Sequence, residues 1–451
     1  MLVPSLIVTL IFMVIGAAPA NNANRPFFID SAYSQSSAAT AAEATGGPYI
    51  GVNVNGLATS RSEAKTGSPS IPPNYYDDSF RIISQGGMNH VRLVIYWEAY
   101  EKDPAAFIKE LTIVAQTADK YGLKVMYDNH NFHTSSWLDP TRGNGFPSSF
   151  FSNDPDLYPT GGGGQTAHPT AKLWWTNWWN GTIKDASGVD GWTLQANFLK
   201  KMVSTVDSHP STLGYEILSE PQVHSIDQWS KIGTYNTFMV NQLRTLTHKT
   251  IAYSMNIPID LKSPIGVTAP NLAKMAPANK QNVVFKISMY GSPSTSSFQA
   301  SKLRVLVQAH KVTGIPIYIG EWNNVKREKT IDEEGQMVSK INAELSDINQ
   351  TEAIQMVQTF KRIGAWGAAY WIWNFQPHIV SNYNLVDVVS PDAPIQTTQY
   401  FDIVRTAYST VYGDIIMPTG SSSSTVQTCP DGSALDANGN CPATTINQNA
   451  Q

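Results

Sequence analysis

The sequence has little cysteine: only Cys429 and Cys441 occur, and both fall near the end of the chain. The rest of the chain therefore has no cysteine to act as a thiolate nucleophile, a metal ligand or half of a disulfide. The segment between the two cysteines is rich in Pro, Gly and Asn. In an exported protein we expect them to close one small disulfide loop.

The chain also lacks a strong charge of either sign. Its 31 Lys and Arg are spread among 35 Asp and Glu, for a formal net charge of −4. Proteins that bind nucleic acid carry a basic stripe along the phosphate backbone. Nucleic acid is therefore not an expected partner, and the 42% of hydrophobic residues predict a globular protein with a large core.

Long apolar runs are confined to the N-terminus. Leu6 to Gly16 form one such run, and Ala18-Pro19-Ala20 has the small-x-small pattern that signal peptidase accepts. We expect a cleaved signal peptide over residues 1–20, hence a secreted protein without a membrane segment after cleavage. No Lys or Arg precedes the run, which leaves a signal anchor as the alternative, but the run is short for a bilayer core of about 30 Å.

Two segments are low in residues that could form a core. Residues 21–46 are rich in Ala, Ser, Asn and Thr, and residues 415–451 are similar. Such composition is typical of flexible spacers. The segment between them, residues 47–414, is expected to be the catalytic domain.

Within that domain, short runs rich in β-branched and aromatic residues alternate with longer stretches of helical periodicity. Eight such alternations predict a single (β/α)₈ TIM barrel. The expected strands are 49–55, 90–96, 123–129, 212–218, 250–255, 282–288, 315–320 and 367–373. The expected helices include 75–86, 104–120, 191–206, 227–247, 298–312 and 350–363.

A doubly wound open sheet is the alternative fold. It would more naturally carry a glycine-rich fingerprint after its first strand, which Asn53, Asn55 and Gly56 do not provide. The largest irregularity is a long insertion after strand 3, residues 131–190. In a barrel this insertion lies on the face where active sites are built.

Polar and aromatic residues gather at the carboxyl ends of the expected strands, and two of them are glutamates. Glu220 follows the fourth strand and Glu321 follows the seventh. A lone glutamate is more often a surface charge. Two opposed carboxylates beside Trp322, Trp371 and Trp373, however, are the arrangement that glycoside cleavage needs.

In chain order, VRL (91–93), DNH (128–130), YEILSEP (215–221), Tyr290, YIGEW (318–322) and YWIWN (370–374) resemble glycoside hydrolase family 5. This family belongs to the retaining (β/α)₈ hydrolases of clan A, and the resemblance spans most of 48–413. It implies that Glu220 is the general acid/base and Glu321 the nucleophile. It also implies roles for four further residues: Arg92 orients Glu321, Tyr290 bonds to it, His130 contacts sugar hydroxyls and Trp371 floors the −1 subsite. The full expected substrate-binding set is Arg92, His130, Asn131, Ser219, Tyr290, Trp322, Trp371 and Trp373.

Two positions depart from the family pattern. The family has Asn directly before the acid/base and usually His two residues before the strand-six Tyr, whereas this chain has Ser219 and Ser288. Both changes introduce a smaller side chain. We therefore expect a wider or wetter cleft near the sugar 2-position, with either a different 2-substituent or reduced activity.

Glu216 lies four residues before Glu220 on the same strand, so alternation points both side chains into the barrel interior at different depths. We expect Glu216 to be structural. A buried carboxylate needs a counter-charge, and Arg92 is the candidate.

Three other features have competing interpretations. The tryptophans at 174, 175, 178 and 179 are either a satellite core or a sugar platform, and we expect one or two exposed indoles. The DNHNFH segment (128–133) would suit a metal-dependent hydrolase, but no second histidine cluster completes a zinc site, so no metal is expected. The acidic group at 332–334 is interpreted as a solvated loop.

The sequence thus predicts a secreted, monomeric, cofactor-free retaining glycosidase. The expected substrate is a β-1,4-linked polysaccharide, with an endoglucanase or cellulase favoured and mannan or chitosan left open. A catalytically weakened glycan-binding protein and a metal-dependent barrel hydrolase remain as alternatives.

Overall fold

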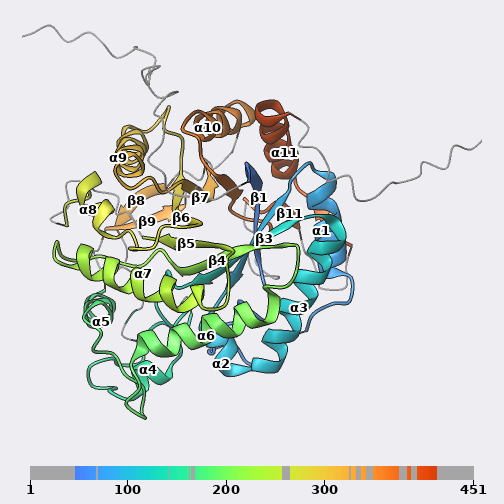
Figure 1. Cartoon of the computed structure of the whole chain (residues 1–451). Coiled ribbons are helices and arrows are strands. Elements are labelled where there is room, and N and C mark those ends of the chain that lie inside the picture. The colour runs from blue at the N-terminus through green and yellow to red at the C-terminus, as the bar shows by residue number, and fades with distance from the viewer. Residues whose placement is uncertain are drawn as a thin grey trace, which may run out of the picture. The chain divides into compact units, whose positions relative to one another are not determined.

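Eight parallel strands close into a barrel in the computed structural model of the chain (Figure 1). Around the barrel they pair in the order β1-β10-β7-β6-β5-β4-β3-β2. Their bounds are β1 (Tyr49–Asn55), β2 (His90–Ile95), β3 (Lys124–His130), β4 (Thr212–Ser219), β5 (Thr250–Ser254), β6 (Val283–Tyr290), β7 (Ile317–Asn323) and β10 (Gly367–Tyr370). The structure describes residues 46–67, 70–141, 143–161, 163, 168–255, 265–324, 327–331, 337–341, 349–374, 383–387 and 394–413.

The predicted (β/α)₈ barrel is confirmed, and each expected strand is present. The seventh differs most, because it spans Ile317–Asn323 rather than residues 315–320. The eighth ends at Tyr370 rather than at residue 373. Its register with β7 shifts between Ala368 and Tyr370, which interrupts the ladder before the predicted end.

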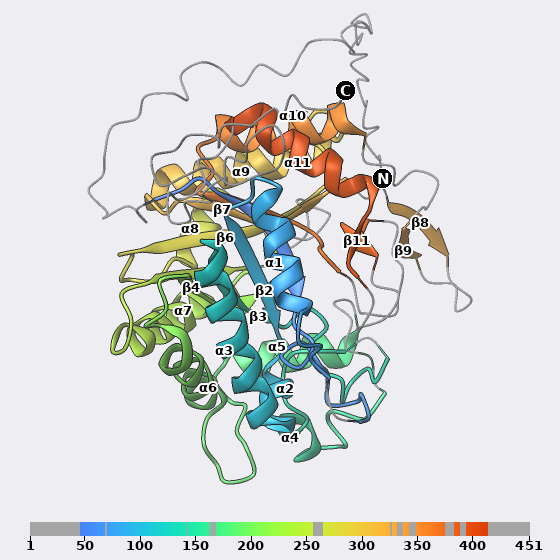
Figure 2. The same ribbon diagram turned by 90° about the vertical axis from the view of Figure 1, so that its right-hand side faces the viewer.

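The six expected helices are also present and form part of the outer layer. Figure 2 shows α1 and α3 in front of the strands. Polar caps fix several starts: Asp103, Asp190, Ser296 and Asn349 each accept a hydrogen bond from a backbone N–H of the first turn. The bounds are α1 (Tyr75–Gln85), α3 (Pro104–Tyr121), α6 (Gly191–Val206), α7 (Gln228–Arg244), α9 (Ser297–Thr313) and α10 (Gln350–Arg362).

Several elements lie outside the simple alternation. The insertion after β3 contains α4 (Ser149–Ser152) and α5 (Pro169–Trp179). The others are α2 (Trp97–Lys102), an antiparallel hairpin of β8 (Arg327–Ile331) and β9 (Met337–Ile341), and the short pair β11 (Val386–Asp387) and β12 (Gln396–Thr397). Two further helices belong to the alternation: α8 (Ala269–Lys274) follows β5, and α11 (Gln399–Tyr412) follows β10.

Helix α11 seals the join between the first and last barrel strands. The Tyr408 hydroxyl lies 3.0 Å from the Gly51 carbonyl oxygen on β1 and 3.1 Å from the Ala368 carbonyl oxygen on β10. One hydroxyl therefore contacts both edges of the seam.

Some expectations fall outside the described residues. These are the signal peptide, almost all of the N-terminal spacer, the tail with Cys429 and Cys441, and the acidic group at 332–334. Among the helices that are described, none has both the length and the apolarity that a membrane crossing requires.

Candidate active site

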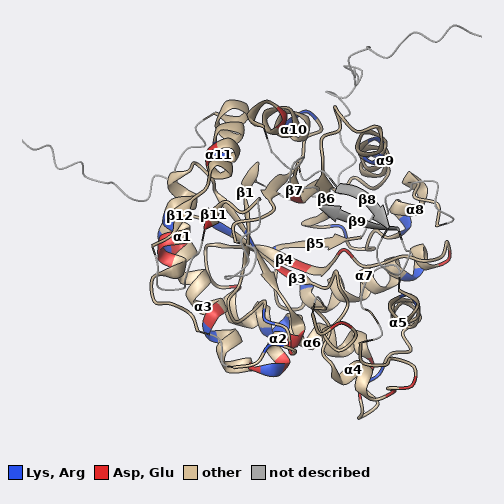
Figure 3. Cartoon of the chain, turned by 180° about the vertical axis from the view of Figure 1, so that it is seen from behind, with Lys and Arg blue, Asp and Glu red and all other residues tan. Residues whose placement is uncertain are grey.

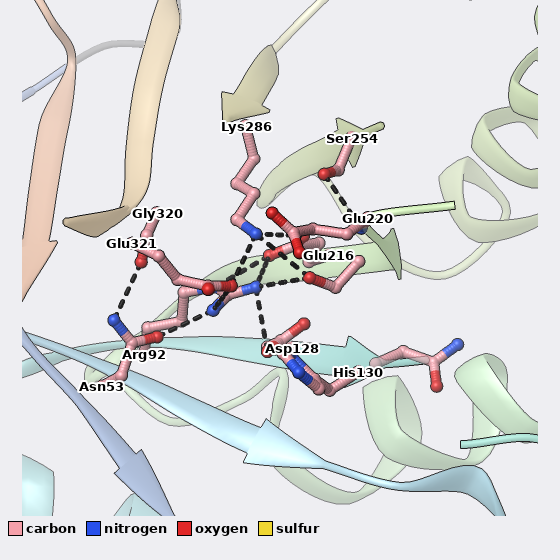
Figure 4. Close-up of polar contacts among 12 residues, drawn as sticks. Asn53, Arg92, Asp128, His130, Glu216, Glu220, Ser254, Lys286, Gly320 and Glu321 are labelled. Carbon is pink, nitrogen blue, oxygen red and sulfur yellow. Dashed lines mark hydrogen bonds and ion pairs between the residues drawn. The ribbon is translucent and has the colours of Figure 1, made fainter. Parts of the chain in front are cut away.

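The two predicted catalytic glutamates come from strands three positions apart around the barrel and meet in one polar cluster. Glu321 lies on β7 and is buried, whereas Glu220 follows the end of β4 and is partly exposed. Figure 4 shows both carboxylates pointing into a group of polar side chains from several strands. Other charged residues lie on outer helices such as α1 and α3 (Figure 3).

The backbone of Glu220 adopts a conformation that side chains seldom accept. Its φ of 49° is in the left-handed region, which costs a non-glycine residue about 1–2 kcal/mol. Its N–H donates to Ser254 Oγ at 3.1 Å, a contact that fixes this turn. Such strain persists where the surrounding structure enforces it, most often at functional sites.

Three side chains donate to the Glu321 carboxylate. Oε1 accepts from Arg92 Nη1 at 3.0 Å and from Lys286 Nζ at 2.7 Å, while the Tyr290 hydroxyl donates to Oε2. Burial alone would raise the pKa of Glu321, but the charges of Lys286 and Arg92 hold this pKa well below its usual range. The carboxylate is therefore ionised and fixed in orientation.

Arg92 is the centre of the buried network. Besides Glu321, its guanidinium lies 2.7 Å from Glu216 Oε2 and 2.9 Å from Asp128 Oδ2, and it donates to Ser219 Oγ at 2.9 Å. Arg92 thus contacts Glu216, as the interpretation of a buried counter-charge requires. Burial nevertheless raises the pKa of Glu216 to about 7, although the charge of Arg92 opposes that rise.

His130 and Trp371 lie together beside the glutamates. Their rings stack with centroids 5.5 Å apart, and His130 Nδ1 is 2.9 Å from Asp128 Oδ2. The Trp371 indole is partly exposed. These two rings can therefore form one wall of a sugar site.

Two predicted substrate contacts are wrong because their indoles pack against the outer helices instead of the barrel interior. Trp322 follows Glu321, so alternation points its indole outward, where Nε1 donates to the Tyr408 hydroxyl at 2.8 Å. Trp373 donates to Ser79 Oγ at 3.2 Å on α1. Both indoles are fully buried between the barrel and the outer helices.

Asn131 is also not available to a substrate in this structure. Its side chain is fully buried, and a Cβ on Gly145 would lie 2.7 Å from it, so the Gly145 backbone closely covers it. Neither of its side-chain polar atoms has a hydrogen-bond partner within the part of the chain that is described. The prediction that Asn131 contacts substrate is therefore wrong here.

Lys286 contacts Glu321 but was not among the predicted site residues. Its ammonium also donates to Ser219 Oγ and Ser288 Oγ, each at 3.1 Å. The space near Ser219 and Ser288, which we expected to be wider or wetter, therefore holds a buried cation. A lysine within the apolar run VVFKISMY, in alternation with Ser288 and Tyr290, was the available signal.

The tryptophans of α5 form a satellite core. Trp174, Trp175, Trp178 and Trp179 are all buried, so the expectation of exposed indoles is wrong. They stack on one another and on aromatic residues of the same insertion and of α7, namely Phe146, Phe150, Phe151 and Tyr235. The insertion is therefore a packed structure rather than an open loop.

This packing gives a prediction for Trp178. Trp178→Ala should lower the free energy of unfolding by about 3–5 kcal/mol, because it leaves a large cavity. The matched control on α5 is Leu173→Ala, which removes a side chain that is 38% exposed and should change stability by only about 0.5 kcal/mol. Denaturant unfolding measures both. If Trp178→Ala left the stability unchanged and selectively lowered the affinity for long glycans, the result would instead favour the interpretation of these tryptophans as a sugar platform.

The described residues contain no group of three or more His, Cys, Asp and Glu placed to hold a metal ion. In the DNHNFH segment, Asp128 instead pairs with Arg92 and His130. The polar groups of this cluster thus form ion pairs between Arg92 or Lys286 and the carboxylates of Asp128, Glu216 and Glu321.

A family model described as Cellulase (glycosyl hydrolase family 5) matches residues 43–376. An endoglycoceramidase of Hydra vulgaris is 26% identical over 178 residues, which is 33% of this chain and 32% of the relative, so the chain matches about a third of that protein's length. Among solved structures, an endogalactoceramidase has a TM-score of 0.57 at 18% identity over 79% of this chain and 80% of its own. A lactosyl-enzyme intermediate of endo-glycoceramidase II from Rhodococcus sp. has a TM-score of 0.55 at 17% identity over 79% and 78%.

Proposed function

Since the chain belongs to the cellulase family, glycosyl hydrolase family 5, and is a glycoside hydrolase, we propose that it cleaves β-glycosidic bonds with retention of configuration. In this proposal Glu321 is the nucleophile and Glu220 the general acid/base. The observation that carries it is the contrast between the two carboxylates. Glu321 is buried, ionised and held by Arg92, Lys286 and Tyr290, whereas Glu220 is partly exposed at the rim.

The hydrogen bonds indicate which oxygen of Glu321 attacks. A carboxylate oxygen has two in-plane lone pairs, and Oε1 uses both to accept from Arg92 and Lys286. Oε2 accepts one hydrogen bond, from Tyr290, and keeps one lone pair. We therefore assign Oε2 as the atom that bonds to the anomeric carbon.

Two displacement steps follow from this arrangement. In the first, Glu321 Oε2 forms a bond to the anomeric carbon while the bond to the leaving oxygen breaks and Glu220 gives that oxygen its proton. In the second, Glu220 takes a proton from a water molecule, which attacks the same carbon and releases Glu321. Retention requires the carboxyl groups to lie about 5 Å apart, and the product should be the β anomer.

For the substrate we propose a β-1,4-linked glycan, with glucan as the first candidate and mannan or chitosan as the next. We also propose that the enzyme is secreted, is monomeric and acts outside the cell. The family description supports a glucan. A second candidate is an oligosaccharide linked to ceramide, and the names of the Hydra vulgaris relative and of the two solved structures support it.

A substrate panel tests the proposal. We expect reducing ends from one of β-1,4-glucan, mannan, xylan and chitosan, or free oligosaccharide and ceramide from a lactosyl ceramide dispersed in detergent. Proton NMR during the first minutes should show the β anomer of the product. Glu321→Gln protein serves as the blank. Binding without any release would favour the weakened glycan-binding alternative, and an α product would contradict retention.

A further inference from the structure

The ammonium of Lys286 is fully engaged inside the barrel. A lysine ammonium has three N–H donors, and here it meets three acceptors: Glu321 Oε1 at 2.7 Å, Ser219 Oγ at 3.1 Å and Ser288 Oγ at 3.1 Å. Figure 4 shows Lys286 beside Glu321. The side chain is completely buried. A buried ammonium with three hydrogen bonds has one well-defined position, so it can fix the groups around it.

Three small residues make room for this side chain. A Cβ on Gly320 would lie 2.5 Å from Lys286 Cγ and 2.6 Å from Cε, so the lysine stem crosses β7 at a position where only glycine fits. The ammonium then ends between Ser219 and Ser288. These are the two positions at which the family pattern carries the larger Asn and His. An Asn side chain at position 219 would extend beyond the serine oxygen and compete with the ammonium for space.

We propose that Lys286 is a positioning residue for the nucleophile: its ammonium occupies the place left by two smaller side chains and holds Glu321 ionised, with Oε2 free to attack. This proposal rests on the proposed role of Glu321. The smaller side chains of Ser219 and Ser288 are thus compensated by Lys286, whose ammonium fills the space that they leave. The serine hydroxyls anchor a second cation. Ser219 itself is fully buried and bound by Arg92 and Lys286, so the prediction that it contacts substrate is wrong.

Charge balance supports the second cation. Lys286 Nζ also lies 3.9 Å from Glu216 Oε1, so the interior pairs two buried cations, Lys286 and Arg92, with Glu216, Asp128 and Glu321. Charged and titratable side chains from several elements face the contact between Lys286 and Glu321. They are Arg92 of β2, Asp128 and His130 of β3, Glu216 and Glu220 of β4, Tyr290 of β6 and Lys302 of α9. With Arg92 already shared among three acids, Lys286 supplies the shorter of the two cation contacts to Glu321.

The test is Lys286→Met, which keeps the stem but removes the charge. Carbon-13 NMR of glutamate carboxyl groups, with Glu321 assigned from Glu321→Gln protein, should show Glu321 titrating about 1–3 pH units higher in the variant than in the wild type. Because Glu321 then takes up a proton at a higher pH, kcat/KM should fall first at the acid end of the profile. Its value near neutral pH should change less.

Lys302→Met is the matched control. Lys302 is also buried near the site, but its ammonium donates to the Ser288 carbonyl oxygen, and burial lowers its pKa to about 8. We expect this variant to move the Glu321 titration less than Lys286→Met does. Glu216→Gln/Lys286→Met removes one buried anion together with the cation and so keeps the net buried charge unchanged. If the single variant fails to fold, this double variant should still show the shifted titration.

Two results of the NMR titration would overturn the inference. One is an unchanged Glu321 titration in both Lys286 variants. The other is an equal shift of the Glu321 titration in Lys302→Met. That result would show that any buried cation nearby affects Glu321, whether or not it contacts the carboxylate. The NMR titration needs no substrate. An inactive wild type would therefore contradict the proposed function, while a wild-type pH profile in active Lys286→Met protein would contradict only this inference.

The compensation by Lys286 can be tested separately with Ser219→Asn, which restores the residue of the family pattern. Alone, this variant should lower kcat because Asn and the Lys286 ammonium compete for one space. In the Lys286→Met background the same change should lower kcat less. Additive losses of kcat in the double variant would contradict the proposal that the introduced Asn side chain and the Lys286 ammonium compete for one space.

Discussion

Glu321→Gln is expected to lower kcat/KM by roughly 10⁶-fold, the size of loss seen when the nucleophile is removed from a covalent hydrolase. The amide has nearly the same shape as the carboxylate but lacks the charge needed to attack the anomeric carbon. Arg92, Lys286 and Tyr290 can still surround it. The loss should therefore be equal for glycosides with good and poor leaving groups, as measured with an aryl glycoside series.

Glu220→Gln gives the contrasting result. We expect a loss of roughly 10²–10⁴-fold on natural glycans, the usual contribution of general acid–base catalysis. The loss should shrink for aryl glycosides whose leaving oxygen needs no proton. Added azide should restore turnover and yield a β-glycosyl azide, because it replaces the water that Glu220 would activate. If either variant kept a tenth of wild-type activity on glycans, its assigned role would be untenable.

The largest expected effect on folding comes from Arg92→Met. Removing one partner of a buried ion pair costs about 3–5 kcal/mol, and Arg92 contacts Asp128, Glu216 and Glu321 at 2.7 to 3.0 Å. Since a domain is typically stable by only about 5–15 kcal/mol, we expect the variant to be largely unfolded or to unfold at much lower denaturant concentration.

Arg81→Met is the control for this variant. Arg81 forms an exposed ion pair of 2.8 Å with Asp78 on α1, and such pairs contribute only about 0.3–0.5 kcal/mol. Urea unfolding of the two variants against the wild type makes the comparison. Similar midpoints for Arg92→Met and Arg81→Met would show that the interior acids do not depend on Arg92.

The barrel could be predicted from the sequence because its strands have a strong local signal. Each is a short β-rich run followed by a helix with a polar start, and both depend on neighbours in the sequence. Helix α11 was missed, since its role as a seal depends on contacts with β1 and β10 that no local pattern reveals. The glutamates were found because each lies at the carboxyl end of a recognisable strand: Glu220 follows β4, and Glu321 lies within the last residues of β7.

The errors in the site come from questions that only packing answers. Trp322 and Trp373 were assigned to the substrate because they stand close in sequence to site residues. Alternation turns Trp322 to the other face of β7, and Trp373 lies beyond the end of β10, where it packs against α1. Lys286 was missed for the opposite reason. A lysine in a buried strand is meaningful only once Glu321, Ser219 and Ser288 are seen around it.

The Tyr408 contacts have a consequence for how the chain folds. Gly51 lies 357 residues before Tyr408, so closure of the seam joins parts of the chain that are far apart in sequence. Contacts of this kind form late and slow the folding reaction. During synthesis β1 must therefore wait, with one edge unpaired, until β10 and α11 have left the ribosome, and that edge is the place where a nascent chain is most exposed to aggregation.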